Sequence, residues 1–299
     1  MAINKKHKDR VFKFIFGKSE NRQWTLDLYN AVNGSNHENA EDIQFNTIED
    51  AVFLGMKNDV SFIIMNEMNL WEHQSTYNPN MPMRFFIYAA KLYEKYISGS
   101  EYYEYSSKLQ SAPKPRCICF YNGTSEQPDK TELKLSDAFG GEGDIEVRVT
   151  MLNINYDKNK SLMEACRPLY EYAWLVAVIR KKQKTMENLE AAVEAAIADM
   201  PKDFVIREFL LLNQAEVKGM FLTEYNQEKV LEQERREALQ EGRQEGIQVG
   251  RQEGINEEKE RVATDMLKDG EPLEKIARYS RLAEEVILKL AQTLGVTVM

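Results

Sequence analysis

Hydrophobic residues recur at helical spacing in two short segments near the start of the chain. Residues 9–17 carry valine, isoleucine and phenylalanine side chains three to four positions apart, and Gly17 follows them as a stop. Residues 24–34 repeat this spacing and end on Gly34. The pattern predicts two helices, each with one buried face.

The hydrophobic period then changes to two, which is typical of half-buried strands. Apolar and polar residues alternate in four consecutive stretches, residues 42–50, 51–56, 59–65 and 69–76. Residues 67–69 are short enough to form the hairpin connection between the last two. We therefore predict four strands in this part of the chain.

The helical period returns over residues 81–98, with Pro82 suited to the first turn. One face of this helix is polar, because Arg84, Tyr88, Lys91 and Lys95 are spaced 4, 3 and 4 apart. Two further alternating stretches, residues 116–123 and 144–155, predict strands. Helices that alternate with about five strands indicate an α/β or α+β core.

Beyond residue 160 no stretch alternates convincingly, and the sequence predicts an all-helical C-terminal region. Residues 161–183, 185–200 and 203–212 have helical spacing, and Pro201 marks a break. We divide the chain into four parts: the core at 1–160, a helical extension that packs on it at 161–222, a glycine-punctuated helix or linker at 223–260 and a small helical unit at 261–299.

Glycines recur at strict intervals of four in the third part, at Gly242, Gly246, Gly250 and Gly254. Four glycines inside a helix cost about 4 kcal/mol relative to alanine, yet residues four apart share one helix face. Such a stripe favours close approach by another helix, which predicts a homodimer through residues 224–260. The alternative is a charged, soft spacer whose period reflects repeat expansion. We favour the helical interpretation.

The last stretch, residues 262–294, predicts three short helices with a break at Asp269–Gly270. Residues 271–290 have the size and rhythm of a helix-turn-helix. The second helix of that unit begins with two acids and offers only Lys289 for phosphates, so a packing or assembly role is favoured over DNA reading.

Composition and charge narrow the class of protein. The chain has 299 residues, 43% of them hydrophobic, and no run approaches the roughly 20 apolar residues of a membrane span. No apolar segment follows the first lysines as in a signal peptide, so we expect a cytoplasmic protein with no membrane partner. Three cysteines predict neither a disulfide framework nor a tetrahedral metal set.

The net charge of −9 argues against a protein that coats nucleic acid through bulk electrostatics. The charge is uneven, however: residues 1–18 carry six bases and one acid, and residues 224–260 carry eleven acids and six bases. A basic front and an acidic back suit a phosphate-binding domain attached to another element, or simply two solvated surfaces.

Two acids in residues 57–76 raise the question of a metal site. Asp59 opens one predicted strand, and Glu72 lies on the next with Gln74 on the same face, whereas Trp71 and His73 point to the other face. A hairpin can bring the two carboxylates together, and hard divalent cations prefer such oxygen ligands. The alternative is an ordinary capping Asp and an edge-strand Glu.

The ordered segments DRVFKFIFG, LDLYNAVNG, MKNDVSF, LWEHQSTYNPNMPMRFFIYAAKLYEKY and PRCICFYNG carry a resemblance. Together, over roughly residues 7–140, they resemble the PD-(D/E)XK nuclease superfamily, and within it the bacterial Rpn branch of recombination-promoting nucleases, also labelled putative transposases. The resemblance implies an α/β, restriction-endonuclease-like core: a mixed sheet of about five strands flanked by helices. It also implies hydrolysis of double-stranded DNA with Mg²⁺ or Mn²⁺ and low sequence specificity, in recombination, mobile-element or defence functions.

The resemblance also implies residue roles. Asp59, Glu72 and the backbone carbonyl of His73 would be the metal ligands. Gln74 stands where the superfamily has Lys and can orient a water without carrying positive charge. A compensating cation would come from the following helix or the N-terminal segment. The implied further residues are Lys91 in catalysis, Lys13, Arg84 and Lys95 in DNA binding, and Asp27 as an extra acid. The alternative function is a catalytically weak or inactive nuclease fold that acts as a nucleic-acid- or protein-binding assembly module.

Overall fold

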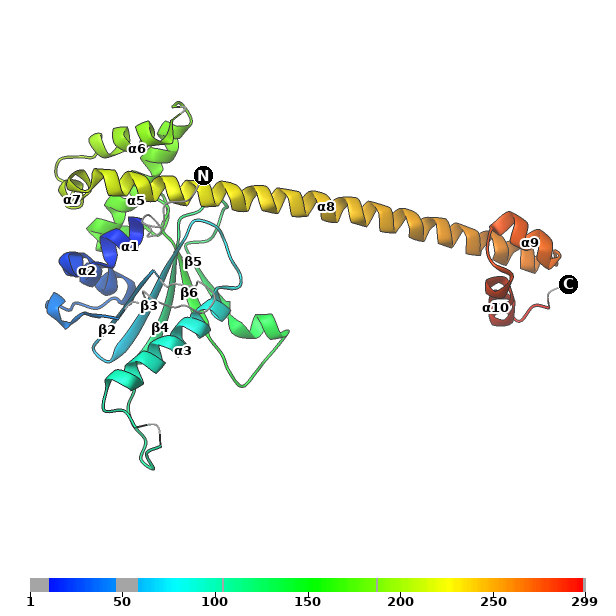
Figure 1. The fold of residues 1–299 in the computed structure, drawn as a ribbon, viewed down its shortest axis with the longest axis horizontal. Coiled ribbons are helices and arrows are strands. Elements are labelled where there is room, and N and C mark those ends of the chain that lie inside the picture. The colour runs from blue at the N-terminus through cyan, green and yellow to red at the C-terminus, as the bar shows by residue number, and fades with distance from the viewer. Residues whose placement is uncertain (1–10, 47–58, 104, 187, 298–299) are drawn as a thin grey trace. The chain divides into compact units, whose positions relative to one another are not determined.

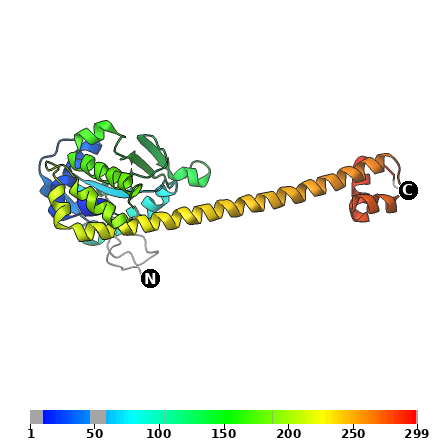
Figure 2. The same ribbon diagram turned by 90° about the horizontal axis from the view of Figure 1, so that it is seen from above.

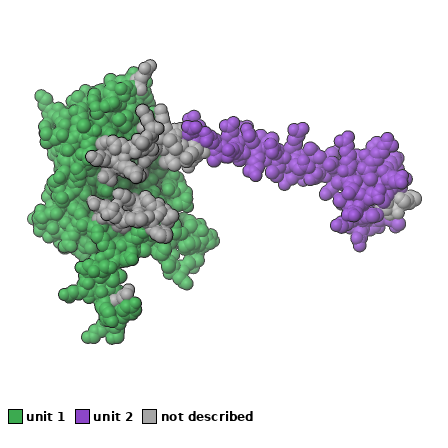
Figure 3. Space-filling model, viewed as in Figure 1, with its two compact units in different colours: residues 1–228 green, residues 229–299 purple. Residues whose placement is uncertain are grey.

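A computed structural model describes residues 11–46, 59–103, 105–186 and 188–297 of the chain. The chain divides into two compact units, residues 1–228 and 229–299 (Figure 3). One predicted strand, residues 51–56, lies outside the described residues.

A six-stranded mixed sheet forms the centre of the first unit, with strand order β1-β2-β3-β4-β6-β5 (Figure 1). The central strands β3, β4 and β6 are parallel to one another, and the other neighbours pair antiparallel. The strands are β1 (Gln44–Phe45), β2 (Val60–Ile64), β3 (Glu67–Gln74), β4 (Lys114–Tyr121), β5 (Lys130–Lys134) and β6 (Arg148–Asn153).

The mixed α/β architecture of the core was predicted with about five strands. The described residues contain six strands, and five of them lie in predicted stretches. The strand missing from the prediction is β5, which lies at the edge of the sheet. Its sequence, KTELK, buries only Leu133. Edge strands tolerate charge because one side faces solvent, so their hydrophobic signal is weak.

The connection between β2 and β3 begins two residues earlier than predicted. Ile64 pairs with Glu67, so the connection is Met65–Asn66, and residues 67–69 belong to β3. Both turn residues have positive φ, 46° and 60°, as the tightest hairpin turns require. Asn tolerates this conformation, but Met rarely adopts it, which is why the sequence did not indicate the turn.

Helices cover both faces of the sheet (Figures 1 and 2). On one face, α1 (Val11–Phe16), α2 (Arg22–Asn33), α4 (Lys160–Ala165) and α5 (Arg167–Gln183) share a core with Phe62, Trp71 and Phe120. On the other face, α3 (Met81–Gly99) packs on Met68 and Leu70. The alternation along β3 therefore divides its side chains between two hydrophobic cores.

Local signals explain the ends of these helices. Gly34 ends α2 with φ of 63°, the left-handed conformation that glycine adopts without penalty. Pro82 lies in the first turn of α3, as predicted. The single helix expected at 161–183 is two, because Cys166, close to Pro168, is extended and separates α4 from α5.

The helical C-terminal region that was predicted is present among the described residues. The remaining helices are α6 (Leu189–Ala198), α7 (Arg207–Leu212), α8 (Gln214–Lys268), α9 (Leu273–Ser280) and α10 (Glu284–Leu294). Short 3-10 helices are η2 (Ser19–Asn21), η3 (Ala40–Asp42) and η4 (Leu135–Phe139). Within the residues that the structure describes, no helix combines the length and apolar composition that a membrane crossing requires.

The second unit has a small core of its own. The end of α8 packs with α9 and α10 through Ala263, Leu267, Ile276, Ile287 and Ala291, all buried. Gly270, with φ of 74°, lies just after the end of α8, where an interruption of the helix was predicted. The glycine repeat lies within α8, so this segment is helical, and a Cβ added at any of its four glycines would meet no atom within 4 Å.

Candidate active site

Asp59 and Glu72 lie opposite each other at the open end of the β2–β3 hairpin. Val60 pairs with Trp71 in the antiparallel register, so the next pair outward is Asp59 and Glu72. Directly opposite residues of such a pair share one face of the sheet, with Cβ atoms about 4.5–5.5 Å apart. The register thus brings the two acids together on the face that α3 covers.

Two hydrogen bonds join Asp59 to the end of β3, one to Glu72 and one to His73. The Asp59 N–H donates to Glu72 Oε1 at 3.2 Å, and the His73 N–H donates to Asp59 Oδ2 at 2.7 Å. The N–H and C=O of one strand residue point to the same side, so the His73 carbonyl also faces Asp59. Two carboxylates and one backbone carbonyl therefore converge at this end of the hairpin.

Glu72 is held by two further donors. Its Oε2 accepts from Arg84 Nη2 at 3.2 Å and from Gln74 Nε2 at 3.4 Å. The Glu72 side chain is only 1% exposed, whereas Arg84 is 27% exposed. A buried carboxylate needs a paired charge, and the guanidinium supplies it. Arg84 thus places positive charge beside Glu72, where Gln74 has none.

Tyr88 is a further neighbour of the acid pair. The sequence pattern placed it on the same polar face of α3 as Arg84 but gave it no role. Its hydroxyl accepts from Arg84 Nη2 at 2.9 Å and from Nε at 3.3 Å. Burial, together with the nearby Glu72 carboxylate, raises the pKa of Tyr88 to about 12. The phenol therefore stays neutral and holds the guanidinium in place from the second turn of the helix.

The imidazole of His73 belongs to the opposite face of the sheet. Its Nε2 lies 3.1 Å from the Tyr172 hydroxyl, and its ring stacks on Phe12 with centroids 5.3 Å apart. The ring is therefore a core side chain, and only the backbone of His73 reaches the acid pair. This agrees with the alternation along β3.

The predicted lysines lie on two elements. Lys91 continues the polar face of α3, three positions after Tyr88, and is partly exposed. Lys95 follows on the same face. Together with Lys13 of α1 and Lys18, it lines a pocket of about 400 Å³ that also includes Asn46 at the end of β1. The fold thus brings Lys13 and Lys95, which are far apart in sequence, to one surface.

Asp27 is not brought to the acid pair. It lies on α2, which packs on the face of the sheet opposite α3. Its carboxylate accepts from Gln23 Nε2 at 2.9 Å, one helical turn away. Asp27, predicted as an extra acid, therefore lies in the helical layer on the opposite face of the sheet from the Glu72 side chain.

The chemistry of the site is that of oxygen donors. Within the described part of the chain, no group of three or more His, Cys, Asp or Glu side chains gathers as a metal site. The set at the hairpin end is smaller: the carboxylates of Asp59 and Glu72 and the carbonyl of His73. This donor set fits a hard divalent cation that keeps several waters, as Mg²⁺ does.

The cysteines take no part in this site. None of the three forms a disulfide bond, and burial raises the pKa of the Cys117 and Cys166 thiols to about 12. A protonated, buried thiol is a poor nucleophile and a poor metal ligand.

The chain was also compared with known proteins. None of the protein-family models, curated protein sequences or solved structures matches it. The assignment of the site therefore depends on the geometry of Asp59, Glu72, His73, Gln74 and Arg84.

Proposed function

We propose that this chain is a metal-dependent DNA endonuclease with a restriction-endonuclease-like core, related to the Rpn branch of the PD-(D/E)XK superfamily. The observation that carries the proposal is the placement of Asp59 and Glu72 on one face of the sheet, directly opposite in register and hydrogen-bonded across the strands. The proposal includes double-stranded DNA as substrate, low sequence specificity and a cytoplasmic location.

Asp59, Glu72 and the His73 carbonyl would hold one Mg²⁺ or Mn²⁺ ion. When bound, such an ion lowers the pKa of a water ligand and offsets negative charge on a phosphodiester. Glu72 Oε2 now accepts from Arg84 and Gln74, so the protein already gathers positive and polar donors where that charge develops.

Gln74 and Arg84 divide the work that a single lysine does elsewhere in the superfamily. The Gln74 amide can orient a water through its carbonyl oxygen or its N–H groups. Arg84 supplies the positive charge, and its planar guanidinium can donate to a phosphate oxygen in a fixed geometry. Lys91, on the same helix face, is the second cation of this kind.

DNA is held through its backbone in this proposal. The support is the pocket that Lys13, Lys18 and Lys95 line together with one acid, Glu20, which lies 3.7 Å from the Lys18 amine. Lysines bind phosphates as point charges and carry no base information, which agrees with low sequence specificity. Their contribution falls as salt rises, because binding releases counterions from DNA.

A plasmid cleavage assay tests the proposal. Full-length protein should nick or linearise supercoiled DNA with Mg²⁺ or Mn²⁺ and not with chelator, and Asp59→Ala and Glu72→Gln should each lower the rate at least 100-fold, on the order of a lost catalytic group. Glu142→Gln is the matched control, since Glu142 is an exposed acid of the same unit. Equal cleavage by wild type and Asp59→Ala would show a contaminating nuclease and end the proposal.

The alternative is a catalytically weak or inactive nuclease fold that binds nucleic acid or protein in an assembly. The observation in its favour is that Gln74 stands in place of lysine and Arg84 occupies Glu72 Oε2. Calorimetric titration with Mg²⁺ and Mn²⁺ distinguishes the two. Metal binding that is lost in Asp59→Ala, without cleavage by the wild type, would favour the inactive form.

A further inference from the structure

Arg180 differs from the other partly buried arginines described in the first unit. Four of these pair with a carboxylate: Arg22 with Glu41, Arg84 with Glu72, Arg116 with Glu67 and Arg207 with Glu208. Among the residues that the structure describes, Arg180 has no such partner. Partly buried guanidinium groups are costly without a counter-charge, so this one requires an explanation.

Neutral oxygens fix the Arg180 guanidinium in place. Nη1 donates to Asn155 Oδ1 at 3.0 Å, and Nη2 donates to the Asn122 carbonyl and, at 3.4 Å, to its Oδ1. A guanidinium has five N–H donors in a rigid fork, so donors remain for another group. The positive charge is therefore oriented by the protein but not neutralised by these contacts.

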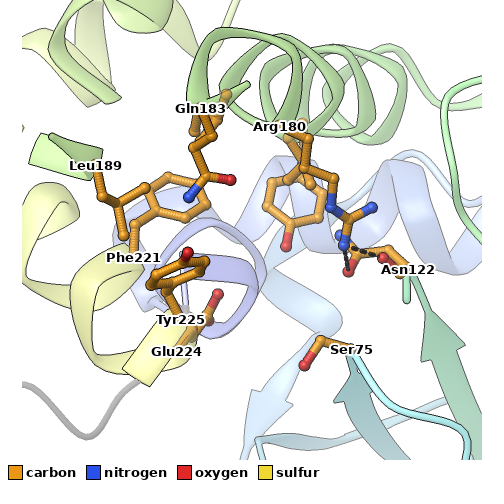
Figure 4. Close-up of a pocket in the computed structure, with 11 residues that line it drawn as sticks. Ser75, Asn122, Arg180, Gln183, Leu189, Phe221, Glu224 and Tyr225 are labelled. Carbon is orange, nitrogen blue, oxygen red and sulfur yellow. Dashed lines mark hydrogen bonds between the residues drawn. The ribbon is translucent and has the colours of Figure 1, made fainter. Parts of the chain in front are cut away.

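A small cavity of about 50 Å³ lies beside this guanidinium. Figure 4 shows Arg180 and its hydrogen bonds to Asn122 on one side, Ser75 at the end of β3, and Gln183, Glu224 and Tyr225 on the other. One water needs about 10–15 Å³, so this volume accommodates roughly three to five water-sized groups. That is the size of a phosphate group and too small for a base.

The cavity lies at the same end of the strands as the acid pair. Ser75 directly follows Gln74, and the Asn122 N–H donates to the Gln74 carbonyl at 3.0 Å. Gly123 allows this close packing, because a Cβ there would overlap the Ser75 carbonyl oxygen. By alternation Ser75 points to the α5 face, whereas Glu72 and Gln74 point to the α3 face. A DNA strand that lies across this end of the sheet would therefore pass both the acid pair and the cavity.

We propose that Arg180 and the Ser75 hydroxyl form a phosphate subsite. It binds a phosphate group of the DNA strand that neighbours the phosphate at which cleavage occurs. The ligand class is a phosphate monoester or diester, which a guanidinium recognises through paired N–H donors. The identity of the strand rests on the proposed nuclease function; the anion site itself depends only on the geometry of Arg180.

The carboxylate of Glu224 opposes anion binding in this subsite. It lines the same cavity, and its Oε1 accepts from the Val11 N–H at 3.2 Å. A carboxylate that lines the same cavity disfavours an anion there, so its removal should tighten phosphate binding while removal of Arg180 weakens it. Opposite effects from two residues of one cavity separate a binding site from a general loss of structure.

Equilibrium binding of the full-length protein to a short fluorescent DNA duplex, measured by anisotropy in chelator, tests the proposal without cleavage. Arg180→Gln should weaken binding about tenfold and lower the salt slope by about one, and Ser75→Ala should weaken it about threefold. Glu224→Gln should tighten it. Lys181→Gln is the matched control, because it removes the same charge from the next, exposed position of α5. It should change binding less than twofold.

The outcomes separate this inference from the proposed function. Arg180-dependent binding by a protein that never cleaves supports the subsite and removes the nuclease. Cleavage with unchanged binding in Arg180→Gln and Ser75→Ala overturns the subsite alone. If Arg180→Gln does not fold, Ser75→Ala and Glu224→Gln decide in the same way. Thermal protection by inorganic phosphate without DNA binding would overturn the assignment to a DNA strand.

Discussion

The open end of the β2–β3 hairpin and the glycine repeat of α8 both begin as short spacing patterns, and the structure defines them to very different degrees. At the hairpin, the register places Asp59 opposite Glu72, and each named polar group has a specific partner. In the repeat, residues 236–258 are all exposed. Spacing in a paired strand fixes contacts, whereas spacing along an exposed helix fixes only which residues share a face.

The largest expected loss of stability comes from a substitution in the packed β2–β3 hairpin. Trp71 is fully buried and meets Phe62 edge-on with ring centroids 4.8 Å apart. Trp71→Ala should lower the free energy of unfolding by about 3–5 kcal/mol, because the cavity cannot close completely. Urea denaturation followed by far-ultraviolet circular dichroism measures this change.

The matched control for Trp71 is Leu239→Ala, an apolar side chain of the glycine-repeat region that is 76% exposed. Its effect should stay within about 0.5 kcal/mol, as for most exposed positions. A loss at Leu239 comparable with that at Trp71 would contradict the contrast between the two regions and indicate that another surface covers this part of α8.

The same contrast explains what the sequence could predict. The helices around Gly17, Gly34 and Pro82 were predicted, because each signal is local and acts through the backbone. The acids were paired correctly in space because one hairpin separates them. β5 and the Met65–Asn66 turn were missed, since their local composition does not favour the structure that tertiary packing imposes.

Parts of the candidate site depend on contacts that no spacing shows. Arg84 and Tyr88 are one turn apart on α3, but only the packing of α3 on β3 shows that Arg84 reaches Glu72. Arg180 was even less accessible to prediction, because it lies 58 positions after Asn122 in the sequence and meets it only in the folded chain. Asp27 was chosen by type and position, and the layer in which it lies separates it from Glu72.

The second prediction concerns the glycine repeat itself. Changing Gly242, Gly246, Gly250 and Gly254 together to Ala should stabilise the α8 helix by about 3–4 kcal/mol, because each added Cβ meets open space. Thermal melting followed by circular dichroism measures the gain. The predicted homodimer adds a second readout: if two glycine stripes pack closely, the added methyl groups should convert a dimer into a monomer in light scattering.

A matched control is available in the same helix. Gln240, Gln244, Gln248 and Gln252 have the same spacing on a different face and are equally exposed. Changing all four to Ala alters helix propensity far less and should leave the mass unchanged. A monomeric wild type, or a glycine variant that stays dimeric, would refute self-association through residues 224–260.

The smallest expected effect returns to the acid pair and is a dependence on pH. The pKa of Tyr88 is raised to about 12 by burial and by Glu72, so the folded state holds this proton more tightly than the unfolded chain, in which tyrosine titrates near 10. The resulting stability is present below about pH 10 and is lost as pH rises to about 12, for a total of about 2–3 kcal/mol.

Tyr88→Phe removes this contribution, so its unfolding free energy should fall less steeply than that of the wild type over this alkaline window. The wild type loses stability there through Tyr29 as well, because burial and the hydrogen bond to Glu67 raise the pKa of its phenol to about 12. The comparison must therefore be made between variants. Tyr105→Phe, at a side chain that is 78% exposed, should keep the wild-type slope. Equal slopes in all three proteins would mean that the Tyr88 phenol is not held neutral beside Glu72, and the tight packing inferred for this end of the hairpin would be wrong.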